Sequence, residues 1–445
     1  MGKWPKYFNK KLETMRQEEL ASLQEKKLKK QLKYVWENSP FYHRKFKASG
    51  FSPGDFKSLE DLKKLPFTTK DELRESQAEH PPLGDHVAAP MEKIIRIHSS
   101  SGTTGQPSFV GITRHDREVW TEITARSIYT QGIRRDDIVL HAVGLTFFVG
   151  GLPVKDAIEA IGAAFVPIGT GASDRVVGTA QLLRANVLHC TPSYALYLSD
   201  YVRSKVKMDP SRLGLKKIIS GAEPGAGIPS IRKKIQDDFE CVLTEGLGNS
   251  DGAPIIFGEC PSQKGMHFCG QEFILCELID PDTGEVLEMK DNATGELAYT
   301  HIDRECCPLI RFRTRDRVTV WTSRCECGRR SFRVRCIGRT DDMLIVLGVN
   351  VFPSAIKDVV ASLGSRTTGE IQVLLDKPGP AVEPPVKIQV EHSKEVANLS
   401  ALKHEIENLL KEKLVFKAEV NLVPEGTLPR YEMKAKLIRK LYEEG

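Results

Sequence analysis

The sequence predicts an α/β protein with a large N-terminal domain, residues 1–338, and a small α+β C-terminal domain, residues 341–445. A chain of 445 residues is long enough for two or three domains with a sizeable core. Between residues 91 and 338, β-branched apolar runs alternate with helical stretches, which indicates parallel strands joined by crossover helices. A turn-forming sequence at residues 338–342 separates this region from a shorter unit that is long enough for an independent domain.

The individual elements follow from local composition. Residues 7–38 are rich in Lys, Glu, Leu and Gln, which favours a helix, and Asn38-Ser39-Pro40 ends it. Short helical pieces and proline-containing turns follow, up to about residue 90. The expected strands cover residues 94–98, 138–140, 164–168, 295–300, 318–321, 343–347, 370–375 and 386–390. The expected helices cover residues 175–185, 193–205, 354–363 and 402–413.

Composition argues against several kinds of partner. The formal charge of +5 is small for this length and spread along the chain, so neither nucleic acid nor a membrane is expected as a partner. The sequence has no apolar stretch of 18 residues and no apolar run after its N-terminal basic residues, so a cytoplasmic location is expected. Its ten cysteines are expected to be mostly reduced rather than paired in a disulfide framework.

A loop rich in hydroxyl groups follows the strand expected at residues 94–98. Its sequence is Ser99-Ser100-Ser101-Gly102-Thr103-Thr104-Gly105. Glycine lets the backbone approach a ligand closely, and serine and threonine add hydroxyl donors beside free N–H groups, so the loop suits a phosphate chain. The spacing of a Walker loop is absent. The same composition is typical of plain turns, so a structural loop is the alternative.

Seven segments carry a resemblance that extends from Pro40 to Lys434. They lie at residues 99–107 with 113–116, 191–195, 221–224, 304–305 with 308–314, 341–346, 348–353 and 426–430. In this order they resemble the phenylacetate–CoA ligases, a branch of the adenylate-forming superfamily. The resemblance implies a large adenylate-forming domain and a small mobile domain. It also implies two half-reactions: a carboxylate attacks the α-phosphate of ATP and releases pyrophosphate, and coenzyme A then attacks the acyl-adenylate.

The resemblance implies roles for the nucleotide-binding residues. The loop from Ser99 to Gly105 would hold the ATP phosphates, because phosphoryl transfer needs positioning and charge neutralisation. Asp316 would bind the ribose hydroxyls, since a carboxylate can accept from both, and Arg339 would lie near the ribose and the α-phosphate. A turn cap at Asp316 and a hinge salt bridge at Arg339 are the alternatives. The residues implied to border the adenine are Gly221, Ala222, Glu223 and Pro224.

Lys434 matches the catalytic lysine of the small domain, which bridges carboxylate and α-phosphate oxygens during adenylation. A compact ammonium on a flexible stem suits a group that arrives and leaves with a domain. That domain would rotate about a hinge at Asp341 between the half-reactions. Because Lys436 and Lys440 lie nearby, a solvated helix face is the alternative for this region.

Three thiols and an imidazole suggest a metal site. Cys260, His267, Cys325 and Cys327 have the ligand types of a closed tetrahedral zinc site, and some family members have one. The zinc would be structural, because no open coordination position is implied. Cys269 is a rival ligand, and unligated reduced cysteines are the alternative. The adjacent pair Cys306-Cys307 is expected to be packing residues.

The chain departs from the family pattern near the expected nucleotide. Where Tyr-Gly-Leu-Ser-Glu is usual, the sequence runs from Glu245 to Asp251 without a tyrosine. Depending on the register, the aromatic position falls on Glu245 or Gly246 and the magnesium-binding glutamate position on Asn249 or Ser250, so both are missing. Asp251 could supply the carboxylate for magnesium, which needs few protein ligands when phosphates fill the other positions. Further departures are Gln106, Arg315 and Leu347.

The segment at residues 142–151 matches the family segment that lines the acyl pocket. Leu145 stands where an aromatic residue is common, and Phe147 and Phe148 could contact an aromatic ring or fill the core. Gly150 belongs to the same candidate lining. The resemblance implies an aryl or arylacetic acid as the substrate, and the leucine indicates a pocket of a different shape.

The leading hypothesis is an ATP-dependent, AMP-forming ligase that joins an aromatic acid to coenzyme A, with Mg²⁺ and a structural Zn²⁺. Its partners would be the acid, ATP, coenzyme A and a second copy of the chain, since family members are often dimers. One alternative passes the acyl group to an amine, a carrier protein or a cofactor such as a deazaflavin. The other is a nucleotide-binding homologue without ligase activity.

Overall fold

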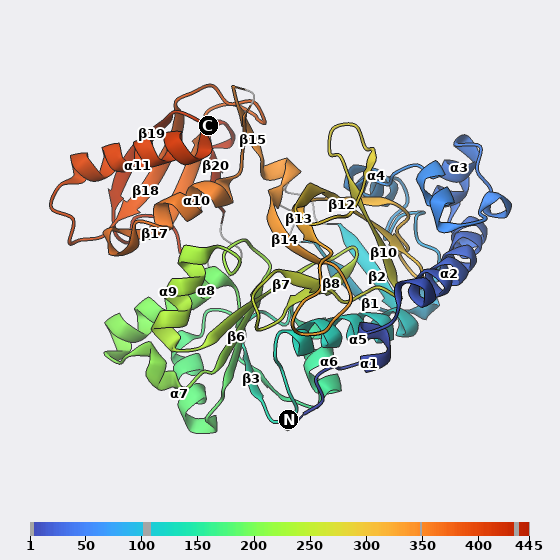
Figure 1. Cartoon of the computed structure of the whole chain (residues 1–445), viewed down its shortest axis with the longest axis horizontal. Coiled ribbons are helices and arrows are strands. Elements are labelled where there is room, and N and C mark those ends of the chain that lie inside the picture. The colour runs from blue at the N-terminus through green and yellow to red at the C-terminus, as the bar shows by residue number, and fades with distance from the viewer. Residues whose placement is uncertain (1–3, 101–107, 348, 431–435, 445) are drawn as a thin grey trace.

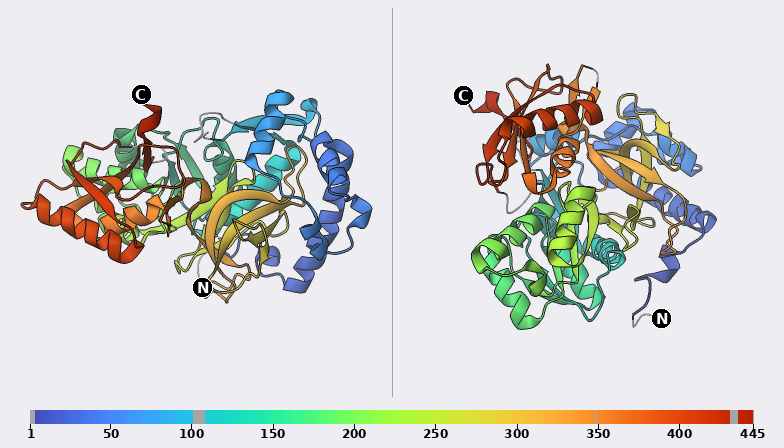
Figure 2. Two further views of the ribbon diagram at one scale, coloured as in Figure 1. Left: turned by 90° about the horizontal axis from the view of Figure 1, so that it is seen from above. Right: turned by 60° about the vertical axis from the view of Figure 1, so that its left-hand side comes forward.

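The computed structural model describes residues 4–100, 108–347, 349–430 and 436–444. Two units with separate cores make up these residues (Figure 1). The larger unit is built around a twelve-stranded sheet, and the smaller unit around a four-stranded sheet near the C-terminus. Two further views place the smaller unit at one end of the molecule, away from the N-terminal helices (Figure 2). The predicted α/β fold with a large and a small domain is confirmed.

One half of the large sheet is parallel, with strand order β7-β6-β5-β3-β4. Apolar side chains from one face pack on α7, α8 and α9, and those from the other face pack on α5 and α6. The strands are β3 (Ile138–His141), β4 (Ala164–Pro167), β5 (Val187–Cys190), β6 (Lys217–Gly221) and β7 (Val242–Asn249). The helices are α5 (Arg114–Thr130), α6 (Leu152–Ile161), α7 (Ser173–Leu183), α8 (Pro192–Tyr201) and α9 (Pro229–Phe239). The predicted crossover arrangement is confirmed here.

The other half of the large sheet is antiparallel, and it continues from β7 in the order β8-β9-β14-β13-β12-β10-β11. Its strands are β8 (Ala253–Glu259), β9 (Met266–Phe268), β10 (Ile274–Ile279), β11 (Val286–Leu287), β12 (Ala293–His301), β13 (Phe312–Trp321) and β14 (Arg333–Arg339). Along β13, buried and half-buried residues alternate, as expected of a strand with one covered face.

Helix α5 begins at a capping box that also joins two distant sequence segments. Thr113 and Asp116 cap the helix reciprocally. The Asp116 carboxylate accepts the N–H groups of Glu305 (2.8 Å) and Cys306 (2.9 Å), and the Thr113 hydroxyl donates to the Glu305 carboxylate (2.7 Å). Cys306 and its neighbour Cys307 are buried, as their expected packing role requires.

The N-terminal helices pack against the segment around residues 302–310, which is distant in the sequence. Tyr42 is fully buried, and its hydroxyl accepts the N–H of Ile310 at 3.1 Å. The long helix predicted over residues 7–38 is divided in two, and Ser39 separates its second part from the next helix. The elements are α1 (Lys10–Glu13), α2 (Gln17–Asn38), α3 (Pro40–Ala48), α4 (Lys70–Glu79) and the antiparallel hairpin of β1 (Ile94–Ser99) and β2 (Phe109–Thr113).

The C-terminal unit has a sheet in the order β19-β18-β17-β20, with α10 and α11 packed on it. A two-stranded hairpin, β15 with β16, precedes it. The elements are β15 (Leu344–Val346), β16 (Val349–Val351), α10 (Pro353–Ala361), β17 (Thr367–Leu375), β18 (Val386–His392), α11 (Leu399–Leu414), β19 (Ala418–Pro424) and β20 (Ile438–Lys440). No helix in the described residues is long and apolar enough to cross a membrane.

Candidate active site and metal centre

The hydroxyl-rich loop joins β1 to β2 and begins beside two other candidate segments. The Ser99 N–H donates to the Phe147 carbonyl at 3.0 Å, and the Ser250 hydroxyl donates to the Ser99 carbonyl at 3.4 Å. At the neck of the loop, the Ser100 and Ser108 hydroxyls lie 3.0 Å apart. The other predicted phosphate-binding residues, Ser101, Gly102, Thr103, Thr104 and Gly105, lie outside the described residues.

The predicted adenine-bordering segment lies at the carboxyl end of β6, the edge where parallel sheets bind ligands. A side chain at Gly221 would place its Cβ 2.6 Å from the Gly246 carbonyl oxygen, so only glycine fits. Ala222 has a positive φ of 71°, which turns the chain away from the strand. The Glu223 carboxylate accepts the Ser193 N–H at 2.8 Å, which ties this segment, up to Pro224, to the start of α8.

The predicted ribose-binding residues form one ion-paired group. Asp316 and Arg339 are opposite each other on β13 and β14, and their side chains are 2.9 Å apart. The Arg339 guanidinium also donates to both oxygens of Asp341, each at 2.9 Å. Although burial opposes it, Arg339 lowers the pKa of the Asp341 carboxyl. The structure therefore brings both predicted nucleotide residues to the junction between the two units.

Asp251, the predicted magnesium ligand, has a cation beside it. The Lys70 ammonium donates to its two carboxylate oxygens at 2.6 and 2.7 Å, and both side chains are largely buried. Sequence reasoning missed Lys70, because it lies 181 residues away in the short helical segments and no local pattern singles it out. Asn249, one of the two residues that can match the family glutamate, accepts the Gly252 N–H at 2.6 Å and so shapes a turn.

Glu245, one of the two residues that can match the family tyrosine, lies in a group of buried charges. Its carboxylate accepts the Gly227 N–H at 3.0 Å, and its own N–H donates to the Glu259 carboxylate at 3.2 Å. Arg232 pairs with Glu259 at 2.6 Å. Burial, reinforced by the charge of Glu259, raises the pKa of Glu245 to about 7. Glu245 thus fastens the loop after Pro224 to the sheet.

The predicted acyl-pocket segment surrounds the turn before α6. Leu145 and Phe147 are 39% and 59% exposed, whereas Phe148 and Gly150 are half-buried. The Phe147 ring lies 6.2 Å from that of Phe109, at the neck of the hydroxyl-rich loop. Aromatic side chains therefore stand next to the predicted phosphate site.

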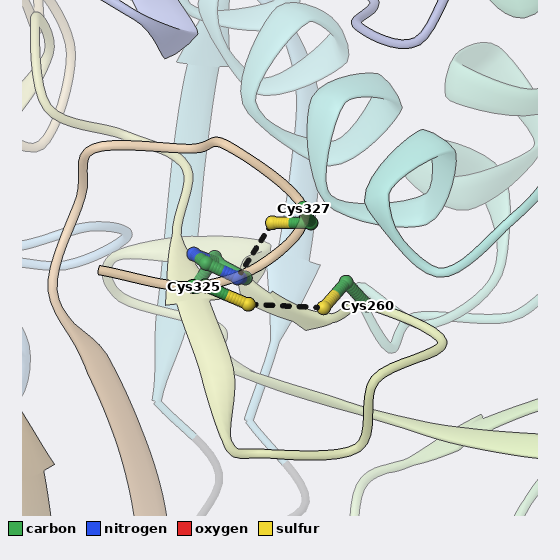
Figure 3. A group of neighbouring side chains, drawn as sticks. Cys260, Cys325 and Cys327 are labelled. Atoms are coloured by element: carbon green, nitrogen blue, oxygen red, sulfur yellow. Dashed lines mark hydrogen bonds between the residues drawn. The ribbon is translucent and has the colours of Figure 1, made fainter. Parts of the chain in front are cut away.

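The four predicted metal ligands come together from three segments of chain. The ligand atoms of Cys260, His267, Cys325 and Cys327 all lie within 4.8 Å of one another. Cys260 and Cys325 place their sulfur atoms 3.7 Å apart, and the Cys327 sulfur is 3.2 Å from His267 Nε2 (Figure 3). A hydrogen bond to His267 lowers the pKa of Cys325, which favours the thiolate that a metal requires. The hydrogen bond between Cys260 and Cys327 lowers the pKa of Cys327 and raises that of Cys260. This donor set fits tetrahedral zinc.

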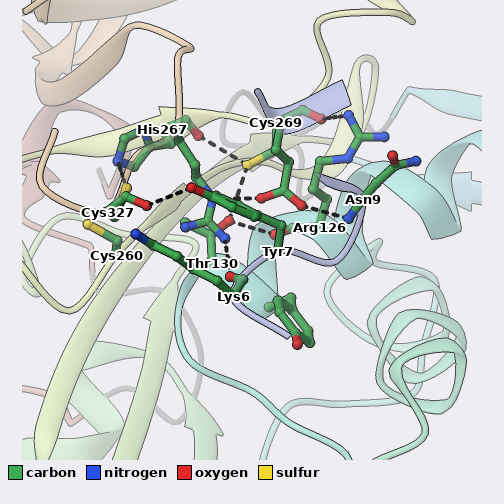
Figure 4. Close-up of polar contacts among 12 residues, drawn as sticks. Lys6, Tyr7, Asn9, Arg126, Thr130, Cys260, His267, Cys269 and Cys327 are labelled. Carbon is green, nitrogen blue, oxygen red and sulfur yellow. Dashed lines mark hydrogen bonds and ion pairs between the residues drawn. The ribbon is translucent and has the colours of Figure 1, made fainter. Parts of the chain in front are cut away.

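The rival ligand Cys269 lies outside this group. Its thiol donates to the His267 carbonyl at 3.3 Å instead (Figure 4).

The N-terminal arm, residues 4–14, packs against the loop that carries Cys327. Tyr7 donates to the Cys327 carbonyl at 3.3 Å, and the buried pair Glu13–Arg329 has a separation of 2.7 Å.

Comparison with known proteins identifies the family. The model of the AMP-binding enzymes matches residues 23–301, and that of the AMP-binding enzyme C-terminal domain matches residues 348–440. The phenylacetate–coenzyme A ligase of Thermus thermophilus is 35% identical over 442 residues, covering 96% of this chain and 97% of that protein. The chain belongs to the phenylacetate–coenzyme A ligase family. The ligase of the same name from Escherichia coli K12 is 33% identical and covers 95% of both chains.

Solved structures agree with membership of this ligase family. A crystal structure of 2-hydroxyisobutyryl-CoA ligase in the postadenylation state, with an acyl-AMP bound, has a TM-score of 0.91 at 28% identity, covering 100% of this chain and 95% of that one. The same enzyme with 2-HIB-AMP and CoA in the thioesterification state has a TM-score of 0.73 at 30% identity, covering 99% and 93%. The protein is an AMP-forming acid–CoA ligase that uses ATP and works through an acyl-adenylate.

Proposed function

We propose that the acid is a compact aromatic one, an aryl or arylacetic acid. The observation that carries this is the position of Phe147 beside the neck of the hydroxyl-rich loop, where an acyl group would meet the α-phosphate, with Phe148 next to it in the chain. Relatives at 33–35% identity that bear the name phenylacetate–coenzyme A ligase support it. Leu145 and Gly150 would complete the lining.

In this proposal the nucleotide lies along the carboxyl edge of the parallel strands. The loop from Ser99 to Gly105 holds the phosphates, and residues 221–224 border the adenine. Asp316 accepts hydrogen bonds from the ribose hydroxyls, with Arg339 holding its carboxylate in place. Mg²⁺ accompanies ATP, and its protein ligand is Asp251. Lys70, which is ion-paired with Asp251, would have a role of its own, because its ammonium would help to neutralise the charge of the phosphates.

The proposal divides the chain at the turn that contains Asp341, with domains at residues 1–338 and 341–445. The small domain would rotate about Asp341 and bring Lys434, which lies outside the described residues, to the carboxylate and α-phosphate during adenylation. The TM-scores of 0.91 and 0.73 with two states of one related enzyme support a mobile unit.

Zn²⁺ at Cys260, His267, Cys325 and Cys327 would be structural, because four protein ligands leave no open position. The proposal also includes a homodimer, to be checked by mass in solution.

The test is pyrophosphate release from ATP and Mg²⁺ with a panel of aryl, arylacetic and short aliphatic acids, with and without coenzyme A. Release with aromatic acids, together with a thioester product when coenzyme A is present, is the expected result. Pyrophosphate release that is the same with and without coenzyme A, and yields no thioester, would favour an amine, carrier protein or cofactor as the acceptor. Preference for the aliphatic acids would overturn the proposed substrate class, and nucleotide binding without release for any acid would favour the homologue without ligase activity.

A further inference from the structure

His98 is a buried histidine directly before the hydroxyl-rich loop, and it belongs to none of the seven segments that carry the family resemblance. It lies on β1, is 1% exposed, and has Val110 on β2 as its register partner. Its Nδ1 atom is 3.0 Å from the Phe147 carbonyl oxygen. Because a carbonyl oxygen only accepts hydrogen bonds, Nδ1 must be the donor in this contact.

Burial sets the protonation state of the His98 ring. It lowers the pKa of His98 below its ordinary value of 6.5, although the hydrogen bond to Phe147 acts in the opposite direction, so the ring is neutral at pH 7. A neutral imidazole carries a single N–H, and the Phe147 carbonyl fixes it on Nδ1. Nε2 is then an acceptor, and it has no hydrogen-bond partner in the part of the chain that the structure describes. The orientation of the ring therefore depends on its bond to Phe147 and on packing.

The Phe147 carbonyl accepts hydrogen bonds from two consecutive residues at the end of β1. The second donor is the Ser99 N–H, also at 3.0 Å. Residues 142–151, the acyl-pocket segment, are all described by the structure and form neither helix nor strand. Contacts with neighbouring elements must therefore help to set the shape of this segment. The two bonds from β1 provide such contacts at Phe147, whose side chain is 59% exposed.

The His98 ring packs beside Trp120 of α5. The centroids of the two rings are 5.8 Å apart, and Trp120 is 2% exposed. Its indole N–H donates to the Gly252 carbonyl at 2.9 Å, directly after Asp251 in the chain. An imidazole confined in this way cannot easily turn, so its Nδ1–H can hold the Phe147 carbonyl in one place.

We propose that His98 is a positioning residue for the acid: its Nδ1–H, acting through the Phe147 carbonyl, holds the acyl-pocket segment against the start of the hydroxyl-rich loop. This inference rests on the proposed function, in which the segment receives the acid and the loop receives the phosphates of ATP. His98 touches neither substrate in this arrangement. Its hydrogen bond keeps Phe147 in the position that binds the acid, so loss of the donor weakens acid binding more than ATP binding.

Two substitutions separate the hydrogen bond from packing. His98→Asn keeps an N–H donor near the position of Nδ1 but leaves space beside Trp120, whereas His98→Leu fills that space without a donor. His98→Leu should raise KM for phenylacetate in pyrophosphate release about tenfold, a change typical of one lost buried hydrogen bond, and His98→Asn should restore most of the difference. In both variants KM for ATP should stay within about twofold of the parent value.

His43→Leu is the matched control. His43 of α3 also has its Nδ1 beside a carbonyl, that of Trp36 at 3.1 Å, and its ring also packs on a tryptophan, with centroids 4.2 Å apart. It lies among the N-terminal helices, so its substitution should leave both KM values unchanged.

KM does not depend on the amount of active enzyme, so partial unfolding of a variant does not disturb the comparison. An Asn variant that is impaired as much as the Leu variant would overturn the inference, because volume rather than the donor would then matter. An unchanged KM for phenylacetate in His98→Leu, or an equal rise in KM for ATP, would also overturn it. A parent enzyme that accepts aliphatic acids alone would instead overturn the proposed substrate class, and the same comparison with the best of those acids would then decide the role of His98.

Discussion

Glu245 is a carboxylate in surroundings that disfavour its charge. Its pKa of about 7 in the folded chain exceeds the ordinary value of 4.5, mainly because of burial and the nearby Glu259. Between pH 4.5 and 7 the folded state keeps a proton that the unfolded state has released, so this group makes stability fall as pH rises through that window.

Glu245→Gln removes this penalty and keeps an acceptor for the Gly227 N–H. The variant is expected to be more stable than the parent at pH 8 by about 1–2 kcal/mol, with the difference vanishing near pH 4. Denaturant unfolding across this pH range measures it, with the exposed Glu412→Gln as control. A difference that does not change with pH would contradict the pKa assignment.

Lys434→Ala should abolish adenylate formation and spare thioester formation from a preformed adenylate. The loss of a cation at the reacting oxygens is expected to slow adenylation by about 10²-fold or more. Pyrophosphate exchange measures the first half-reaction, and Lys436→Ala is the neighbouring control. An exchange rate that Lys434→Ala leaves unchanged would show that the lysine is misassigned.

Sequence reasoning found the site residues that belong to contiguous patterns. Asp316 and Arg339 lie in matched segments, and the structure pairs them. The four metal-ligand candidates were recognisable by residue type, and the structure brings them together. Lys70 could not be found, because its importance lies in a contact with Asp251 across 181 residues.

At the level of elements, the proposed metal site connects the end of β8 and strand β9 to the loop before β14. Cys325→Ser should release the metal and lower the melting temperature by roughly 5 °C, because binding energy at a closed site contributes to folding. Elemental analysis and thermal unfolding measure both effects. Cys241→Ser, at a half-buried cysteine outside the cluster, should keep its metal. Purified protein without metal, together with an unchanged melting temperature, would refute the zinc proposal.

The predicted helices and strands agree best with the structure where the hydrophobic periodicity and the helix-breaking or strand-breaking residues indicate the same bounds. The helices at 175–185 and 402–413 correspond to α7 and α11, and the strands at 370–375 and 386–390 to β17 and β18. Strand β19 was not predicted, although its exposed Glu419 and Asn421 alternate with covered apolar residues, as is typical of an edge strand with one polar face. The split of the N-terminal helix was missed because residues 14–16 contain neither Gly nor Pro.

For the whole molecule, the proposed hinge predicts a separation of the two half-reactions. Asp341→Pro fixes φ near −65° and should restrict rotation. Adenylation is expected to persist, whereas thioester formation should fall about tenfold or more, as expected when a domain movement is blocked. Asp341→Ala is the control, because it loses the contact with Arg339 without restricting the backbone. Pyrophosphate exchange and thioester release measure the two steps, and equal losses in both would contradict a hinge at this residue.

The packing of the N-terminal arm on residues 327–330 has a consequence for biosynthesis. Glu13 is translated 316 residues before its buried partner Arg329. At 5–20 residues per second, the arm waits about 15 to 60 s for its binding surface. The arm is thus made well before the surface on which it docks, and during that interval the nascent chain exposes it to chaperones and proteases.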